Sequence, residues 1–74
     1  LITGSNGLLG QKLVELLTQK PNIQTIATAR GENRLPQKDG YEYQKMDITD
    51  RKQVLDVIAS TKPDVVIHTA AMTN

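Results

Sequence analysis

Three glycines stand three residues apart in the segment TGSNGLLG, at Gly4, Gly7 and Gly10. A short apolar stretch precedes the segment and leucines at helical spacing follow it, so it lies between a strand and a helix. Gly4 would allow a tight turn, Gly7 would let a phosphate approach the backbone, and Gly10 would let the helix pack closely. The free N–H groups of the first helical turn favour an anion. The segment predicts a pyrophosphate site, with an empty glycine-rich turn as the alternative.

A tyrosine and a lysine four residues apart form a second pattern, in YEYQK from Tyr41 to Lys45. On a helix the two side chains would lie one turn apart, and the lysine could assist the tyrosine in acid catalysis. The preceding Gly40 and the alternation of side chains favour an edge strand instead. On a strand the two residues lie about 13 Å apart, too far for direct coupling. We therefore predict no catalytic role for this pair.

His68 is the one histidine of the chain, which contains no cysteine. A single histidine without cysteines cannot assemble a zinc site, so we expect no metal. Its place at the end of an apolar strand predicts a buried or half-buried neutral imidazole with a hydrogen-bonded partner. The lack of cysteine fits a reducing compartment, and we expect the cytoplasm.

The elements that would position these residues alternate along the chain. Helical spacing of leucines over residues 9–20 ends at Pro21, and Asp50 with Gln53 forms a capping box that opens a second helix. Strands are predicted over residues 1–3, 23–29, 41–46 and 65–67, the last as an apolar run covered on both faces. The order β-α-β-β-α-β predicts an α/β fold with a Rossmann-type doubly wound parallel sheet. Right-handed crossovers place the first strand between the second and the fourth.

The composition favours one small intracellular domain. Nine Lys and Arg and eight Asp and Glu give a net charge of +1, with the two signs interspersed. No basic stripe indicates nucleic acid or an anionic membrane surface. Without Phe or Trp, the core must be built from aliphatic side chains and must be thin in a chain of this length. No apolar run is as long as a membrane span, and we expect no signal peptide.

Three features together resemble the cofactor domain of the extended short-chain dehydrogenase/reductases. They are the T-G-x-x-G-x-x-G spacing, the pair Asp47 and Ile48 after the third strand, and DVVIHTAA ending at Ala71. The segment 63–74, PDVVIHTAAMTN, is similar to the dTDP-4-dehydrorhamnose reductase branch. The resemblance covers nearly the whole chain. It implies that residues 1–74 are part of an NAD(P)-binding Rossmann domain that begins before Leu1 and continues after Asn74.

The resemblance also implies cofactor contacts by position, most of them through the backbone. Those expected around the pyrophosphate are Gly7, Leu8 and Leu9, and Gly4 and Asn6 of the same loop are also expected to bind the cofactor. Those expected beside the adenine are Asp47 and Ile48, and those along the ribose and nicotinamide are Ala70, Ala71 and Met72. A carboxylate at Asp47 can accept a hydrogen bond from the adenine amino group, or act as a charge near the next helix. Thr73 and Asn74 would face the substrate or turn the chain.

The end of the second strand bears on the choice of cofactor. Enzymes that prefer NAD usually carry Asp or Glu there, to bind the ribose 2′-hydroxyl. This chain has Ala29 and Arg30, and a guanidinium can bind a 2′-phosphate in a bidentate way. Arg34 and Lys38 are further candidates, or ordinary solvated charges. We therefore expect NADP(H), with NAD(H) as the alternative.

The family resemblance implies hydride transfer to a nucleotide-linked 4-keto sugar, with a catalytic tyrosine and lysine on a helix beyond Asn74. No catalytic residue is therefore expected in residues 1–74. The parent could instead be a sugar-nucleotide epimerase or dehydratase. A third alternative is a regulatory protein resembling the beta subunit of methionine adenosyltransferase. The expected partners are the dinucleotide, a nucleotide-sugar substrate and, in the parent, a second copy in a homodimer.

Overall fold

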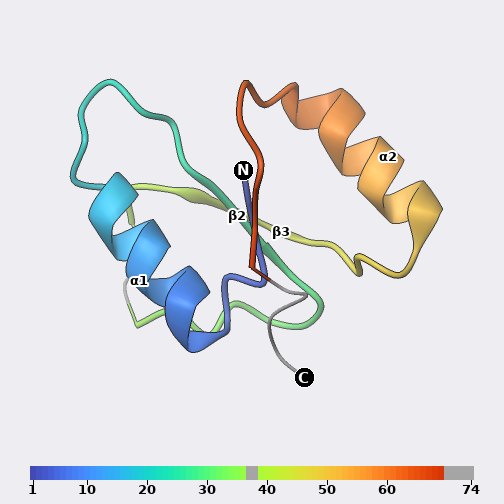
Figure 1. The fold of residues 1–74 in the computed structure, drawn as a ribbon, viewed down its shortest axis with the longest axis horizontal. Helices are drawn as coiled ribbons and strands as arrows, with labels where there is room; N and C mark the ends of the chain where they lie inside the picture. The colour runs from blue at the N-terminus through green and yellow to red at the C-terminus, as the bar shows by residue number, and fades with distance from the viewer. Residues whose placement is uncertain (37–38, 70–74) are drawn as a thin grey trace.

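The computed structural model describes residues 1–36 and 39–69. It contains four strands and two helices in the order predicted from the sequence (Figure 1). Their bounds are β1 Ile2–Thr3, α1 Leu8–Leu17, β2 Ile26–Ala29, β3 Glu42–Lys45, α2 Arg51–Thr61 and β4 Ile67–His68. Among these residues no helix is long and apolar enough to cross a membrane.

The four strands form one parallel sheet in the order β3-β2-β1-β4. Ile2 of β1 pairs with Ala27 of β2 on one side and with Ile67 of β4 on the other. The predicted central position of the first strand is therefore confirmed, and so is the edge position of the third within the described sheet. The helices α1 and α2 lie on opposite sides of this sheet (Figure 1). This is the doubly wound α/β arrangement that the element order predicted.

Helix α1 is shorter than its leucine pattern suggested. Gly10 and Val14, one turn apart, are its buried residues. The α-helix ends at Leu17, and the chain continues with shorter turn bonds from Gln19 N to Leu16 O and from Lys20 N to Leu17 O. The prediction of helix to residue 20 was wrong by three residues because the last turn tightens to i→i−3 bonding.

Helix α2 begins at the predicted cap. The Asp50 carboxylate accepts hydrogen bonds from the N–H groups of Lys52 and Gln53, and it also accepts one from the Gln53 side chain at 3.0 Å. The Gln53 side-chain oxygen accepts from the N–H of Asp47 at 2.9 Å, so the pair ties the end of β3 to the helix. Lys62 closes the helix in the left-handed region, with φ 47°.

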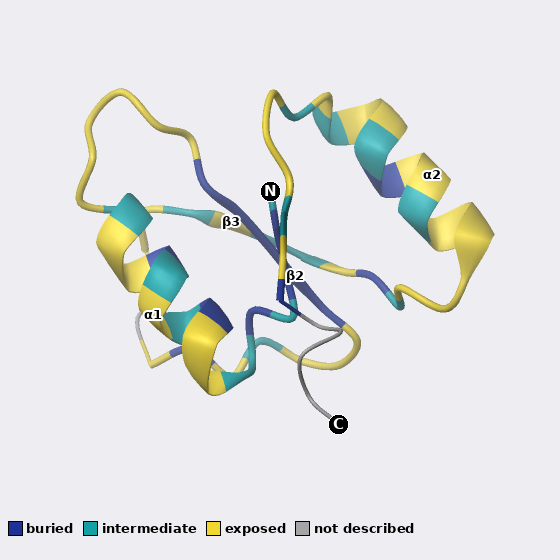
Figure 2. Ribbon diagram, viewed as in Figure 1, coloured by how far each residue is buried: buried dark blue, intermediate teal, exposed yellow. Residues whose placement is uncertain are grey.

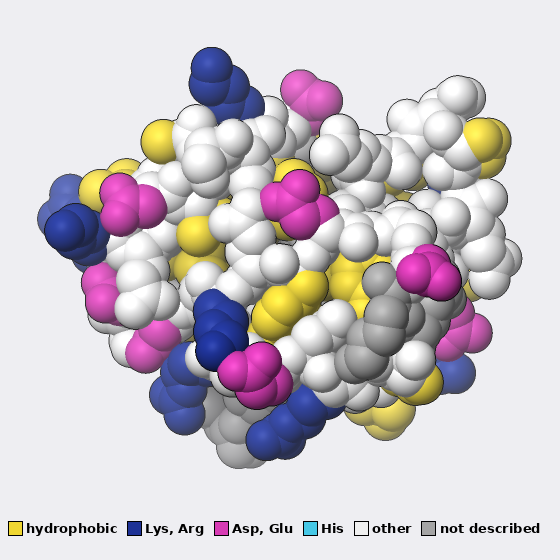
Figure 3. Space-filling view, turned by 180° about the vertical axis from the view of Figure 1, so that it is seen from behind, with side chains coloured by type: hydrophobic (Ala, Val, Ile, Leu, Met, Phe, Trp, Pro, Cys, Tyr) yellow, Lys and Arg dark blue, Asp and Glu magenta, His cyan; other side chains and the backbone are white. Residues whose placement is uncertain are grey.

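The core lies where β1 and β2 meet α1. Ile2, Val14, Ala27 and Leu35 form a buried cluster, to which the loop after β2 contributes Leu35. All four residues of β2 are buried, as the continuous dark ribbon in Figure 2 shows. Strand β2 is shorter than the predicted 23–29, since residues 21–24 are exposed and lie before the sheet begins. On the face seen in Figure 3, charged side chains of both signs lie interspersed with exposed apolar ones.

The fourth strand departs from the prediction. Val65 and Val66, expected in a strand covered on both faces, precede β4 and are 65% and 49% exposed. β4 is the outer strand of the described sheet, and α2 buries only Val57, so no described element covers this apolar segment. The expected burial is therefore wrong for Val65 and Val66, whereas Ile67 is partly buried and packs against the core cluster.

Candidate functional site

The residues with predicted binding roles follow the carboxyl ends of the strands. Gly4 follows β1, Arg30 follows β2, and Asp47 comes two residues after β3. Because all four strands are parallel, their carboxyl ends meet at one edge of the sheet, where open α/β sheets bind ligands. Ala70, Ala71 and Met72, predicted beyond β4, lie outside the described residues, as do Thr73, Asn74 and Lys38. The structure brings the described candidates to one edge.

Gly4 and Gly10 are required by the fold of the loop itself. Gly4 has φ 68°, a left-handed conformation that favours glycine, and its carbonyl accepts from the N–H of Gly7 at 3.0 Å. A Cβ on Gly10 would lie 2.3 Å from Gly4 O and 2.7 Å from Ser5 Cα, which are backbone atoms. Helix α1 can therefore start against the end of β1 only if residue 10 has no side chain.

Gly7 is different, because the described protein gives it no steric reason to be glycine. It is the N-cap of α1, with φ −74° and ψ 167°, an extended conformation open to any residue. The nearest atom to a Cβ built there is Gly4 O at 3.4 Å, an ordinary contact. A serine at this position would cap the helix, whereas glycine caps with no side chain. The missing side chain leaves space for a group that approaches from outside the chain.

The first turn of α1 presents free donors beside that space. The first intrahelical bond runs from Gln11 N to Gly7 O at 2.9 Å, so the N–H groups of Leu8, Leu9 and Gly10 precede the helical ladder. Within the described part of the chain, no side chain caps these groups. The side chains of Leu8 and Leu9 are exposed, at 80% and 48%. The geometry fits a phosphate held by backbone N–H groups and the helix dipole.

The side chain of Asn6 points to another loop. Its Nδ2 donates to Glu32 O at 2.9 Å, and its Oδ1 accepts from Arg34 N at 2.8 Å. Its backbone oxygen accepts from Gln11 Nε2 at 2.8 Å. The predicted contact between Asn6 and a cofactor stays a prediction, since the structure shows its side-chain amide bound to the loop after β2. Sequence reasoning gave no signal for this bridge.

Arg30 and Asp47 are neighbours across the ends of β2 and β3. Ala29 pairs with Lys45, and the N–H of Met46 donates to Ala29 O at 2.8 Å. Hydrogen bonds from the hydroxyl and the N–H of Thr49 lower the pKa of Asp47, and the charge of Arg30 lowers it further. The Thr49 hydroxyl donates to Asp47 Oδ1 at 2.7 Å. Asp47 is therefore held as a carboxylate ahead of α2, which suits both of its predicted roles.

The YEYQK segment forms strand β3, and its tyrosine and lysine have separate partners. Tyr41 lies just before the strand, and its hydroxyl accepts from Asn33 Nδ2 at 2.8 Å. Lys45 pairs with Glu32 at 2.5 Å on the surface, a contact that raises the pKa of Lys45 and lowers that of Glu32. The prediction of a strand is confirmed over Glu42–Lys45, in place of 41–46. The helical arrangement that could couple the pair is absent.

Tyr43, between them, supports the loop after β2. Its hydroxyl donates to the carbonyl oxygen of Gly31 and lies 3.4 Å from that of Ala29. Burial raises the pKa of Tyr43, and a hydrogen bond with Asn6 opposes this shift. The tyrosine therefore holds the backbone beside Arg30.

Thr3 joins the ends of β1 and β4, a role not predicted. Its hydroxyl lies 2.7 Å from His68 Nδ1 and accepts from the N–H of Thr69 at 3.1 Å, while the Thr69 hydroxyl donates to Thr3 O. The predicted partner for His68 is confirmed, but its predicted burial is wrong: the residue is exposed on the outer strand. Among the described residues no cluster of His, Asp or Glu could hold a metal ion.

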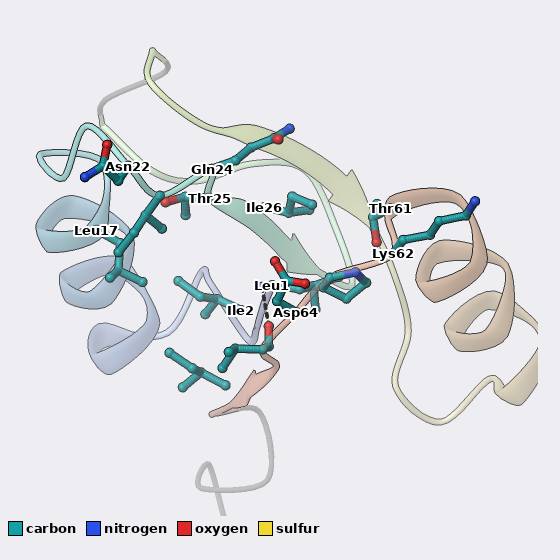
Figure 4. A pocket seen from close by; sticks show the side chains of 14 residues that line it. Leu1, Ile2, Leu17, Asn22, Gln24, Thr25, Ile26, Thr61, Lys62 and Asp64 are labelled. Carbon is teal, nitrogen blue, oxygen red and sulfur yellow. Dashed lines mark hydrogen bonds between the residues drawn. The ribbon is translucent and has the colours of Figure 1, made fainter.

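One cavity lies away from this edge. A volume of about 490 Å³ is lined by residues that include Leu1, Ile26, Thr61 and Asp64 (Figure 4). These residues mark the starts of β1 and β2 and the end of α2, which is the opposite edge of the sheet. Leu1 and Val65 both line the cavity, and the Leu1 amino group donates a hydrogen bond to Val65 O. The cavity contains none of the predicted site residues.

Residues 1–74 match the model of the NAD dependent epimerase/dehydratase family. The chain belongs to this family. A dTDP-4-dehydrorhamnose reductase of Aggregatibacter actinomycetemcomitans is 32% identical over 74 residues, which cover 100% of this chain and 21% of the relative. A GDP-6-deoxy-D-talose 4-dehydrogenase of the same organism is 32% identical over 73 residues, covering 99% and 21%. No solved structure matches the chain significantly.

Membership of the epimerase/dehydratase family confirms the resemblance to the extended short-chain enzymes and the Rossmann-type fold. The family description names NAD, and the two relatives are by name a reductase and a dehydrogenase of nucleotide-linked sugars. The chain spans about a fifth of the length of these relatives, 21% in each case.

Proposed function

We propose that this chain is part of the NAD(P)-binding domain of a larger oxidoreductase, whose substrate is a nucleotide-linked 4-keto sugar. The family match and the names of the two relatives support this reaction class. When bound, the nicotinamide supplies the hydride. Residues 1–74 bind and orient the cofactor, and the catalytic tyrosine and lysine lie beyond Asn74.

Gly7 is the single observation that carries the proposal. Gly4 and Gly10 are explained by the chain's own backbone, through a positive φ and a contact of 2.3 Å, but Gly7 is not. At a helix N-cap a glycine without a structural reason costs stability relative to Ser or Asp. A pyrophosphate seated against this backbone accounts for it, because any Cβ there would face the phosphate oxygens.

The other residues follow from the position of that phosphate. The N–H groups of Leu8, Leu9 and Gly10 donate to its oxygens, with the positive end of α1 behind them. Asp47 faces the adenine with Oδ2, since Thr49 occupies Oδ1. Ile48, which is 38% exposed, packs against the adenine ring. Ala70, Ala71 and Met72 extend the site along the ribose and nicotinamide.

We further propose a preference for NADP(H), carried by Arg30. Arg30 is exposed directly after β2, where an NAD-specific site would place a carboxylate. Replacing Arg30 with Asp should weaken NADPH binding by about tenfold or more, the value of a charged hydrogen-bonded contact, and NADH binding far less. Titration of the whole protein with each cofactor measures the effect. Lys20→Asp, with the same charge reversal on an exposed residue at the other edge, is the control, and equal effects on both cofactors would refute the preference.

The reaction is tested with the whole protein, NADPH and dTDP-4-dehydrorhamnose as the representative 4-keto sugar. We expect oxidation of NADPH that requires the sugar. Cofactor binding without oxidation would reject the reductase and favour an epimerase or dehydratase of the same family, which is assayed with nucleotide sugars that carry a 4-hydroxyl. Absence of binding to either cofactor would reject the proposed function altogether.

A further inference from the structure

The side chain of Asn6 joins the glycine loop to the loop that follows β2. Its amide pairs with the two backbone groups that flank Asn33, donating to Glu32 O at 2.9 Å and accepting from Arg34 N at 2.8 Å. The partners fix the orientation of the amide, because a carbonyl can only accept and an N–H can only donate. One planar group therefore ties down three consecutive residues.

Asn6 is itself held in place from the helix side. Gln11, in the first turn of α1, donates from Nε2 to the Asn6 backbone oxygen at 2.8 Å. The neighbouring Gly7 N–H bonds to Gly4 O at 3.0 Å, which closes the turn below Asn6. The bridge thus connects the loop after β2 to backbone that is itself hydrogen-bonded at the start of α1.

The same loop is fixed from its other side by β3. The Tyr43 hydroxyl donates to the Gly31 carbonyl, and the Glu32 carboxylate pairs with Lys45. Asn33 Oδ1 accepts from the N–H of Leu35 at 3.1 Å, and Leu35 is 3% exposed in the core. The backbone of residues 31–34 is therefore anchored by the glycine loop, by β3 and by the core.

Arg30 and Arg34 flank this anchored segment. Both are exposed, and their side chains are long and flexible, so the backbone from which they extend decides where a guanidinium can reach. A loop that is ordered before binding loses less conformational entropy when the ligand binds, so the affinity is higher. The bridge from Asn6 thereby sets the position of the two arginines relative to the phosphate loop.

We infer that Asn6 is a positioning residue that sets the preference for NADP(H) over NAD(H) by holding the segment from Arg30 to Arg34, and that its side chain does not contact the cofactor. The inference rests on the proposed function, since it concerns the cofactor of that same site. It separates two roles within the glycine loop: Gly7 accommodates the pyrophosphate shared by both cofactors, and Asn6 acts on the phosphate that only one of them carries.

The test is the ratio of the dissociation constants for NADH and NADPH, measured by titration of the whole protein. Asn6→Ala removes the two hydrogen bonds to the loop backbone, and should weaken NADPH binding about tenfold while leaving NADH within about twofold. Tyr43→Phe removes the hydroxyl that donates to Gly31 O and bonds to Asn6. It keeps the Asn6 bonds to Glu32 and Arg34, and it should shift the ratio in the same direction. A purely structural loss would weaken both cofactors together and leave the ratio unchanged.

A double-mutant cycle with Arg30→Ala completes the test. If Asn6 acts through the arginine, Asn6→Ala should change NADPH affinity little once Arg30 is absent. Equal weakening of NADH and NADPH, or fully additive effects of the two substitutions, would overturn the inference. Failure of the unaltered protein to bind either cofactor would overturn the proposed function, and the inference with it.

Discussion

At the scale of single residues, the three glycines of one motif have three separate causes. Gly4 meets a backbone requirement, Gly10 meets a packing requirement, and Gly7 meets neither within the described protein. The regular spacing in the sequence does not indicate this difference. It becomes clear from the φ angle of Gly4 and from the contacts that a Cβ would make at Gly7 and at Gly10. The separation allows stability and ligand binding to be tested at different glycines of the same loop.

Replacing Gly10 with Ala should destabilise the protein. Alanine favours a helix over glycine by about 1 kcal/mol, so an unhindered site would gain stability. Here the added Cβ would lie 2.3 Å from Gly4 O and 2.9 Å from Gly4 C, and moving this backbone costs about 1–3 kcal/mol. Urea unfolding of the two proteins measures the difference. An alanine variant as stable as the parent would contradict the close contact between α1 and the end of β1.

The Asp47 carboxylate provides a test that depends on pH. Thr49→Val removes the hydroxyl that donates to Oδ1 and should raise the pKa of Asp47 toward its ordinary value of 3.8. Because the pKa is lowered in the folded state, its contribution to stability is present above that ordinary value and is lost as the pH falls through the lowered pKa. The two proteins should therefore differ in stability at neutral pH and converge in acid. An NMR titration that gives the same pKa for the Asp47 carboxyl in both proteins would contradict the contact.

At the scale of elements, α2 depends on its first turn. Its one buried residue is Val57, so little apolar burial holds it to the sheet. Hydrogen bonds at its first turn stabilise the helix instead. The Asp50 carboxylate accepts from two backbone N–H groups, and the Gln53 side-chain oxygen accepts from the N–H of Asp47. The sequence predicted the pairing of Asp50 with Gln53 because the two residues are three positions apart, as in a capping box.

Asp50→Ala should lower the free energy of unfolding by about 1 kcal/mol, the usual value of an N-cap. Asp56→Ala is the matched control on the same helix, since Asp56 is exposed in its middle and alanine is the better helix former. Urea unfolding compares the two variants. Equal losses, or a larger loss at Asp56, would contradict the capping role of Asp50.

At the scale of the whole molecule, the sequence predicted the topology better than the element lengths. Alternation of strands and helices, with the right-handed crossover rule, is enough to place β1 between β2 and β4. Burial along β4 could not be predicted in the same way, because an apolar run such as Val65 and Val66 does not say which element covers it. The structure leaves both exposed.

In the candidate site, too, some residues could be predicted from the sequence and others could not. Glycine spacing, Arg30 and Asp47 were predicted because each lies at a strand end that the sequence marks. The Asn6 bridge and the Thr3 contacts with His68 and Thr69 were not, because they join residues separated by 26 to 66 positions. A side chain that bonds a distant backbone leaves no local pattern in the sequence.

The proposed function is tested most directly at Gly7, by titrating NADPH into the whole protein and into its Gly7→Ser variant. Serine is a preferred N-cap, so the variant should unfold at the same or a slightly higher urea concentration. Its side chain would occupy the space left for the pyrophosphate, so NADPH and NADH affinity should both fall by about tenfold or more. An equally stable serine variant that binds both cofactors as tightly as the unaltered protein would contradict the assignment of this loop as the phosphate site.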